Sequence, residues 1–175
     1  MVSRAAAGHQ PADAQTLQAV RAAAAGVPDP EIPVVTIAEL GILRDVRLAA
    51  DGHPEIVLTP TYSGCPATEA IQQDVLSAVR AIDPRATVVV ELAPAWTTDW
   101  ITESGRAKLA EYGIAPPRPT RSGPISIQLG RPMPVRCPRC DSANTELISQ
   151  FGSTPCKALR RCLDCAEPFD EFKPL

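Results

Sequence analysis

Four of the six cysteines form two Cys-x-x-Cys pairs in the last quarter of the chain. The first pair is Cys137 with Cys140, the second is Cys162 with Cys165, and 21 residues separate them. Each pair aims two thiolates at one point, so two pairs can close a tetrahedral four-sulfur site. Because this set contains no histidine, no carboxylate and no open position, we expect a structural Zn2+, with a four-thiolate iron or an iron–sulfur cluster as the alternative.

Basic side chains flank these four cysteines. Four thiolates around Zn2+ carry a net charge of −2, which neighbouring guanidinium groups can offset. The same groups could instead bind phosphate or nucleic acid, but aromatic residues are not interleaved with them. The four arginines are Arg136, Arg139, Arg160 and Arg161.

A fifth cysteine, Cys65, lies where a predicted strand is followed by a predicted helix. Pro66 follows it directly, and proline favours the first position of a helix. The unpaired N–H groups and the positive dipole end of a helix favour an anion there, so we expect the thiol pKa to be lowered. A thiolate at such a position could bind metal or act as a nucleophile. The alternative is a small buried apolar residue, which many free cysteines are.

The sixth cysteine, Cys156, belongs to neither pair, and we expect it to lie near the metal site. Lys157 beside it could lower its pKa. The alternative is a packed strand residue.

Two other segments could contribute to a site. The loop at residues 27–33 holds three prolines, which favour a rigid extended conformation, and it carries the carboxylates Asp29 and Glu31. These acids are either ligand-positioning groups or solvated surface charges. Both tryptophans, Trp96 and Trp100, fall in one predicted loop. They could cover the Cys65 edge, anchor a partner protein or pack against the end of a sheet.

The composition is that of a globular protein of ordinary size. The chain has 175 residues, 45% of them hydrophobic and 21% charged, and a net charge of −3. An acidic chain argues against nucleic acid as a main partner. It has no apolar run that could span a membrane and no secretory signal pattern. Six cysteines in a chain without such a signal favour metal or thiol chemistry in a reducing compartment over disulfides, and we expect a cytoplasmic protein.

Apolar spacing and turn residues predict an α+β domain with the order αββαβα. A helix is expected to end at Gly26, and Asp51-Gly52 to turn a hairpin of strands 42–49 and 55–61. A helix through Ile82, a buried strand at 86–92 and a short helix ending at Gly113 complete the domain.

We expect three segments in the whole chain. Residues 12–114 form the α+β domain, residues 115–124 form a proline-rich linker, and residues 125–175 form a zinc ribbon. Residues 1–11 are expected to be disordered, a short strand is expected at 125–129, and the ribbon strands are expected at 145–151 and 167–172.

Several motifs in this chain resemble known families. Asp29 to Pro33, Leu40-Gly41-Ile42 and Thr59 to Pro66 are similar to the small domain of SufT-like iron–sulfur assembly factors. Phe151 to Leu159 and Glu167 to Lys173 resemble the ribbon of PaaD-like accessory proteins of bacterial phenylacetyl-CoA ring epoxidation.

The resemblance implies an accessory or maturation role in phenylacetate catabolism. Its expected partners are the oxygenase and reductase components of a phenylacetyl-CoA epoxidase, and a homodimer remains an open alternative. By position, the resemblance points to Cys65 as the residue that handles iron or an iron–sulfur cluster transiently, with Asp29 and Thr61 as neighbours. The chain lacks a di-iron carboxylate pattern and a glycine-rich nucleotide motif, so we do not expect it to be the oxygenase.

Two alternatives to a maturation role remain. One is a non-catalytic structural subunit of the oxygenase, with Trp96 and Trp100 as interface anchors. The other is a thiol-dependent enzyme, which would need a histidine near Cys65. The chain has only His9 and His53, and His53 is expected to be exposed in the hairpin turn.

Overall fold

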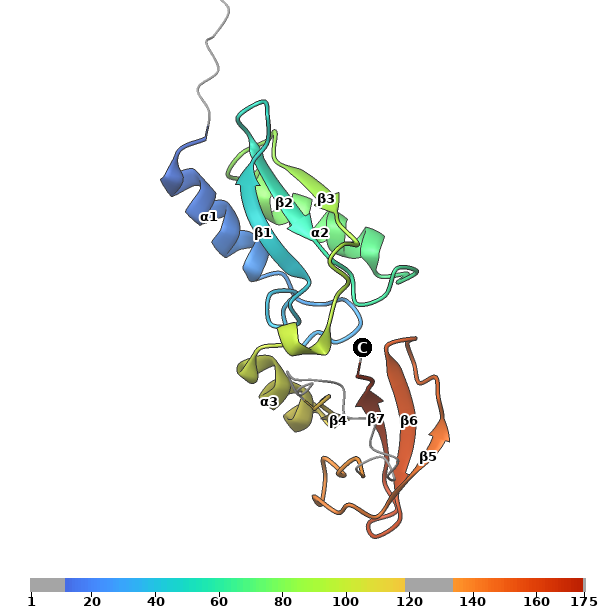
Figure 1. Cartoon of the computed structure of the whole chain (residues 1–175). Helices are drawn as coiled ribbons and strands as arrows, with labels where there is room; N and C mark the ends of the chain where they lie inside the picture. The colour runs from blue at the N-terminus through green and yellow to red at the C-terminus, as the bar shows by residue number, and fades with distance from the viewer. Residues whose placement is uncertain (1–11, 119–133, 175) are drawn as a thin grey trace, which may run out of the picture.

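The computed structural model describes residues 12–118 and 134–174. These residues form two sheets, and two helices pack against the first of them (Figure 1). The expectations for residues 1–11 and for a strand at 125–129 lie outside these described residues. The structure confirms an α+β fold with an N-terminal domain and a C-terminal ribbon.

The N-terminal domain has the predicted order of elements. Strands β1 and β2 are antiparallel, β3 pairs in parallel with β2, and the two long helices pack against each other and the sheet. The short 3-10 helix η1 was not predicted. The elements are α1 (Ala14–Ala25), β1 (Leu43–Leu48), β2 (Pro54–Leu58), α2 (Thr68–Arg80), β3 (Thr87–Val90), η1 (Thr98–Trp100) and α3 (Glu103–Tyr112).

The apolar stripe of α2 buries Ile71, Val75 and Val79, as its helical spacing predicts. The prediction of a helix through Ile82 was wrong at its end, because α2 ends at Arg80 and Ile82 is 39% exposed. The expectation of a fully buried third strand was also wrong. Strand β3 lies at the edge of its sheet and none of its residues is fully buried.

The ribbon is a second sheet with the order β4-β7-β6-β5. Sequence patterns predicted β5 and β7, whereas β6 and the two-residue β4 were missed. Strand β4 directly follows α3 and pairs in parallel with β7, so the expected domain boundary after residue 114 falls inside it. The strands are β4 (Ile114–Ala115), β5 (Thr145–Ser149), β6 (Lys157–Cys162) and β7 (Pro168–Phe172).

The two modules share one hydrophobic core. Phe172, at the end of β7, is 1% exposed and belongs to the buried cluster of the N-terminal domain. Its ring centroid lies 5.9 Å from that of Trp96, whose indole N–H donates to the Leu40 carbonyl at 3.0 Å. Cys156 from the ribbon joins the same cluster. The ribbon therefore completes the interior of the first domain.

No helix within residues 12–118 and 134–174 is both long and apolar enough to cross a membrane.

We predict that Phe172→Ala lowers the free energy of unfolding of the whole protein by about 3–5 kcal/mol, because it empties a site in the shared core. Phe151→Ala is the matched control, since that ring is 68% exposed, and it should cost less than about 1 kcal/mol. Urea unfolding followed by circular dichroism measures both. Equal effects of the two variants would contradict the shared core.

Candidate functional site

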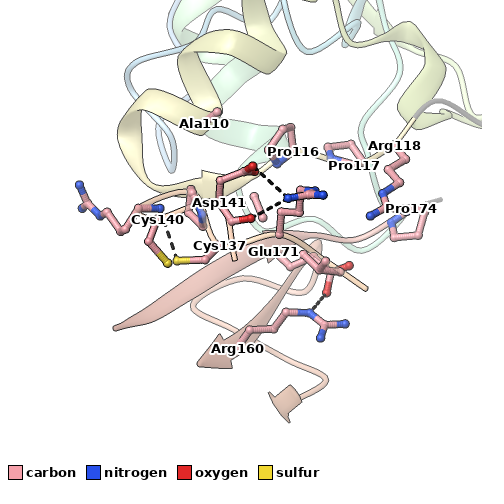
Figure 2. A pocket seen from close by; sticks show the side chains of 15 residues that line it. Ala110, Pro116, Pro117, Arg118, Cys137, Cys140, Asp141, Arg160, Glu171 and Pro174 are labelled. Atoms are coloured by element: carbon pink, nitrogen blue, oxygen red, sulfur yellow. Dashed lines mark hydrogen bonds and ion pairs between the residues drawn. The ribbon is translucent and has the colours of Figure 1, made fainter. Parts of the chain in front are cut away.

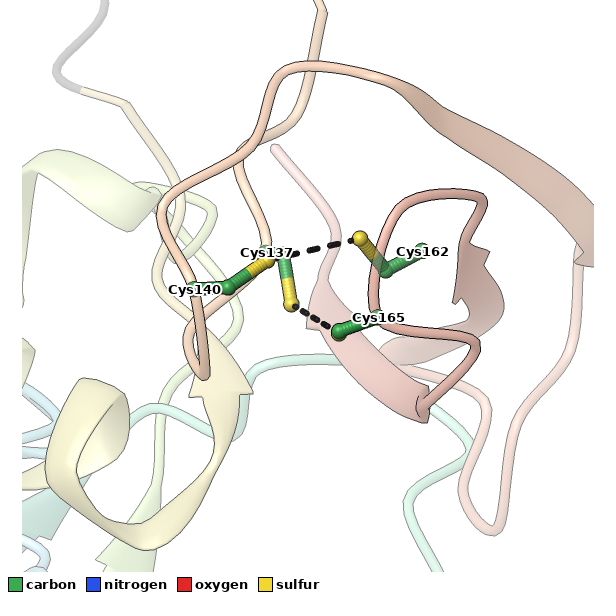
Figure 3. A group of neighbouring side chains, drawn as sticks. All are labelled: Cys137, Cys140, Cys162 and Cys165. Atoms are coloured by element: carbon green, nitrogen blue, oxygen red, sulfur yellow. Dashed lines mark hydrogen bonds between the residues drawn. The ribbon is translucent and has the colours of Figure 1, made fainter.

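The four paired cysteines converge on one point of the ribbon (Figure 3). Their sulfur atoms all lie within 4.8 Å of one another. The Cys137–Cys165 and Cys140–Cys162 distances are 3.8 and 3.6 Å. Zinc–sulfur bonds of about 2.3 Å place the sulfurs of a tetrahedron about 3.8 Å apart. This cluster, called the cysteine quartet below, therefore has the geometry of a four-thiolate metal site.

The electrostatics of the quartet also suit a cation. The backbone N–H groups of Cys165 and Asp164 lower the pKa of the Cys162 thiol to about 7. The pKa of Cys140 is raised to about 12, because the backbone N–H of Ser142 is outweighed by the neighbouring thiols and by burial. Sulfurs so close together cannot all ionise unless a metal offsets their charge.

Three of the four arginines near the quartet bind carboxylates. Arg136 pairs with Asp141 at 2.9 Å, Arg161 pairs with Glu146 at 2.7 Å, and Arg160 pairs with Glu171. Their charges are thus already offset, which argues against a phosphate site.

The fourth arginine, Arg139, lies against Gly113, the residue that ends α3 with φ of 98°. A Cβ atom at residue 113 would come within 3.1 Å of the Arg139 guanidinium. The left-handed backbone favours glycine there, and the close approach means that any larger residue would also have to displace the Arg139 side chain. Gly113 thus lets the end of α3 lie directly against the first cysteine pair.

A cavity of about 890 Å3 lies between α3, β4 and the first cysteine pair (Figure 2). Its wall includes Arg118 and the paired side chains Arg160 and Glu171. Sequence patterns gave no signal for it, because β4 and the position of α3 create it.

Cys65 lies in the loop between β2 and α2, as predicted, and is half-buried. Burial raises the pKa of its thiol, and Glu31 and Asp29 add to this effect. The N–H of Ala67 and the hydroxyl of Thr68 act in the opposite direction but do not prevail. The expectation of a lowered pKa was therefore wrong. The helix end contributes as expected, but desolvation and two nearby carboxylates outweigh it.

Asp29 shapes the proline-rich loop from within. Its side chain is buried, and Oδ1 accepts hydrogen bonds from the N–H groups of Glu31 at 2.9 Å and Ile32 at 2.8 Å. The N–H of Asp29 donates to the Val35 carbonyl at 2.9 Å, so the loop turns back on itself and is not extended. Burial raises the pKa of Asp29, against the effect of these backbone donors and of Lys157.

Cys156 does not lie near the quartet. It precedes β6, and Cys162 ends that strand, so about 20 Å of extended chain separates the two. Its expected lowered pKa was also wrong, since burial outweighs Lys157 and raises the pKa.

The loop that carries Cys156 is tightly folded. Gly152 donates to the Lys157 carbonyl at 2.8 Å, and the Thr154 hydroxyl lies 3.0 Å from the Cys156 sulfur. A Cβ atom at residue 152 would lie 2.8 Å from a carboxylate oxygen of Asp170, so only glycine fits without a shift. This loop fixes Cys156 against the N-terminal domain.

One small cavity brings the predicted site residues together. It measures about 20 Å3, and its polar lining is Asp29, Glu31, Thr61, Cys65 and Cys156. Apolar side chains from both modules close the rest. Sequence reasoning proposed Asp29, Thr61 and Cys65 but missed that Cys156 belongs to the same cavity, called the Cys65 cavity below.

The remaining candidates lie elsewhere. Trp96 is 6% exposed and buried within the chain, so it is not available as a surface anchor. Trp100 is half-buried, with the Arg44 guanidinium 3.4 Å from its ring centroid. His53 is 5% exposed, contrary to the expectation of an exposed turn residue, and its Nδ1 lies 3.4 Å from Asp83. It precedes β2 whereas Cys65 follows that strand, so the two do not form a catalytic pair.

We predict that Asp29→Ala lowers the unfolding free energy by about 1–3 kcal/mol, because two buried N–H groups lose their acceptor. Asp29→Asn should be as stable as the natural protein or more so at neutral pH. Folding raises the pKa of Asp29, so the ionised carboxylate costs stability there, and the amide oxygen of asparagine accepts the same bonds without a charge. Thermal melting separates the two variants, and equal destabilisation by both would contradict this account.

Comparison with known families agrees with the two modules. Residues 17–92 match the model of an iron–sulfur cluster assembly protein, and residues 121–173 match that of the PaaD zinc beta ribbon domain. A domain of unknown function, DUF59, from Bacillus anthracis has a solved structure similar to 54% of this chain and 92% of its own, with 26% identity and a TM-score of 0.49.

Two curated proteins are also similar. A "Fe-S protein maturation auxiliary factor" of Porphyromonas gingivalis (strain ATCC BAA-308 / W83) is 34% identical over 83 residues, which are 46% of this chain and 78% of that protein. A subunit of the "Putative 1,2-phenylacetyl-CoA epoxidase" of Escherichia coli (strain K12) is 52% identical over 149 residues, which are 84% of this chain and 86% of that protein. With this identity over most of the length of both chains, the protein belongs to the PaaD family of the phenylacetyl-CoA epoxidase system.

Proposed function

We propose that this chain is a maturation factor for the oxygenase of the phenylacetyl-CoA epoxidase system, acting in the cytoplasm on the oxygenase and reductase components. In this role Cys65 holds iron or an iron–sulfur cluster transiently and passes it on. The observation that carries the proposal is the placement of Cys65, half-buried beside two carboxylates, inside a domain of the iron–sulfur assembly family. A thiol and carboxylates together are donors that suit iron.

The protein's own residues explain why such binding would be transient. The raised pKa of Cys65 keeps the thiol protonated in the absence of a cation, so a metal must displace a proton in order to bind. This competition weakens binding compared with a site of preformed thiolates. A weaker site suits a protein that must release its cargo.

The proposed role of the ribbon is structural. We propose that Zn2+ occupies the cysteine quartet, where Cys137, Cys140, Cys162 and Cys165 would provide all four ligands and no position for a substrate. Bound there, the metal joins the loop before β5 to the turn between β6 and β7.

A structural subunit of the oxygenase is the second candidate. The name of the Escherichia coli relative favours it, as do the exposed apolar side chains Leu147, Ile148 and Phe151 in and after β5. Stable co-purification with the oxygenase components would support this role, whereas a complex that forms only during maturation would support the first.

We predict that Cys65→Ser lowers phenylacetyl-CoA epoxidation in cells at least about tenfold, because one thiolate ligand is lost. Ser63→Ala, an exposed change in the same loop, should leave the activity unchanged. The measurements are phenylacetyl-CoA consumption and the iron content of the oxygenase and reductase isolated from these cells. Full activity and full iron content with Cys65→Ser would refute the maturation role.

We predict one zinc per chain in the purified protein, and its loss in Cys162→Ser. Without the metal the ribbon strands should unfold, because ligand binding supplies much of their folding free energy, about 10 kcal/mol or more. Cys156→Ser is the control, since this cysteine lies at the opposite end of β6 and should leave the zinc in place. Metal analysis together with circular dichroism tests this pair. A full zinc content in Cys162→Ser would exclude the proposed ligand set.

A further inference from the structure

The Cys65 cavity receives a sulfur atom from each module. Cys65 comes from the loop before α2 in the N-terminal domain, and Cys156 comes from the loop before β6 in the ribbon. The two thiols line the same small cavity, and the charge of Cys65 adds to the burial that raises the pKa of Cys156. The cavity therefore holds two soft ligands, which neither module supplies alone.

Two carboxylates, which are hard ligands, and the ammonium group of a lysine lie near the two thiols. Glu31 lines the cavity, half-buried, and its carboxylate influences both thiols. Asp29 uses Oδ1 on the loop backbone, so Glu31 is the less committed of the two carboxylates. Lys157 is buried beside them and pairs with Asp170 at 3.5 Å. Burial raises the pKa of both carboxyls, and the charge of Lys157 acts against this effect. Two thiolates and one carboxylate suit a divalent transition-metal ion. With the ion bound they carry a net charge of −1, which the positive charge of Lys157 can offset.

The size of the cavity limits what it can hold. About 20 Å3 is the space of roughly one water molecule, and therefore of one metal ion. An iron–sulfur cluster contains several atoms and normally uses four cysteine ligands, whereas this cavity offers two. A cluster would need both a larger opening and thiols from another protein.

We propose that Cys65 and Cys156 together bind a single divalent ion, with Glu31 as a third ligand, across the junction of the two modules. This inference rests on the proposed function and specifies the cargo as one iron(II) ion. Binding forms two metal–sulfur bonds, each thiol gives its proton to solvent, and no electron is transferred. In this proposal Cys156 is a metal ligand, a role that its position in the sequence did not indicate.

The arrangement differs from the quartet in a way that suits release. Among the described residues, the quartet is the only group of three or more cysteine, histidine or carboxylate side chains that could hold a metal ion as the structure stands. The cavity residues do not form such a group, so the binding of an ion there requires their side chains to move closer together. A site that must be assembled on loading binds more weakly than a preformed one.

The test uses the full chain, reduced and free of oxygen, with its quartet filled by zinc. Cobalt(II) is the probe, because thiolate–cobalt bonds absorb light and cobalt does not displace the more tightly bound zinc. We expect one equivalent of cobalt(II) to bind per chain. Added iron(II) should then compete with cobalt for the same site. Cys65→Ser and Cys156→Ala should each weaken binding at least about tenfold and remove about half of the thiolate–cobalt absorbance.

Two controls keep the result interpretable. Ser153→Ala, an exposed change in the Cys156 loop, should bind cobalt as the natural protein does. Cys156→Ala keeps an apolar side chain in the core, and Cys156→Ser provides a second variant if melting shows that alanine disturbs the fold. Normal binding by both folded Cys156 variants would overturn the two-thiol site but leave the Cys65 maturation role standing.

Other outcomes are equally decisive. If the natural protein binds neither cobalt nor iron(II), the inference fails, while the cellular test of Cys65→Ser still decides the proposed function. If iron and sulfide together assemble a cluster that depends on both cysteines, the single-ion inference also fails, although the role of Cys156 as a ligand survives.

Discussion

The burial of Phe172 against Trp96 is the contact on which the arrangement of this protein depends. The ribbon's own buried cluster is small, comprising Ala115, Cys137, Cys162 and Phe169, and β7 places its last side chain in the core of the neighbouring domain. The N-terminal domain in turn lacks a complete interior without that ring. This shared core restrains the motion of each half relative to the other, so the space between them can hold a site of defined geometry.

The same contact connects the two groups of cysteines. The quartet holds the turn between β6 and β7, the pairing of these strands sets their register, and that register places Phe172 and Cys156 against the first domain. A metal bound in the ribbon thus supports the geometry of the Cys65 cavity from about 20 Å away, the length of β6. The proposed metal site in the ribbon and the Cys65 cavity are therefore coupled through the same pair of strands.

Much of the fold could be predicted, because its signals are local. The Gly26 stop of α1, the 3.6-residue spacing in α2 and the Asp51-Gly52 turn each depend on neighbours in the chain. The spacing of the quartet likewise reveals four ligands directly. The Cys65 cavity could be predicted only in part. Cys65 and Asp29 stood out by local context, but Cys156 reaches them through tertiary packing that no short pattern encodes. The predicted direction of the Cys65 pKa shift was wrong for the same reason, because desolvation depends on which residues cover the sulfur in the folded protein.

Strand β4 gives the protein an unusual topology for a chain of two modules. Ile114 and Ala115 leave α3 and lie beside β7, so the first module contributes a strand to the sheet of the second. Meanwhile Phe172 returns from the second module to the interior of the first. The halves are interlocked through these two contacts. Because each half supplies part of the other's sheet or interior, we expect both to unfold in a single cooperative transition and not one after the other.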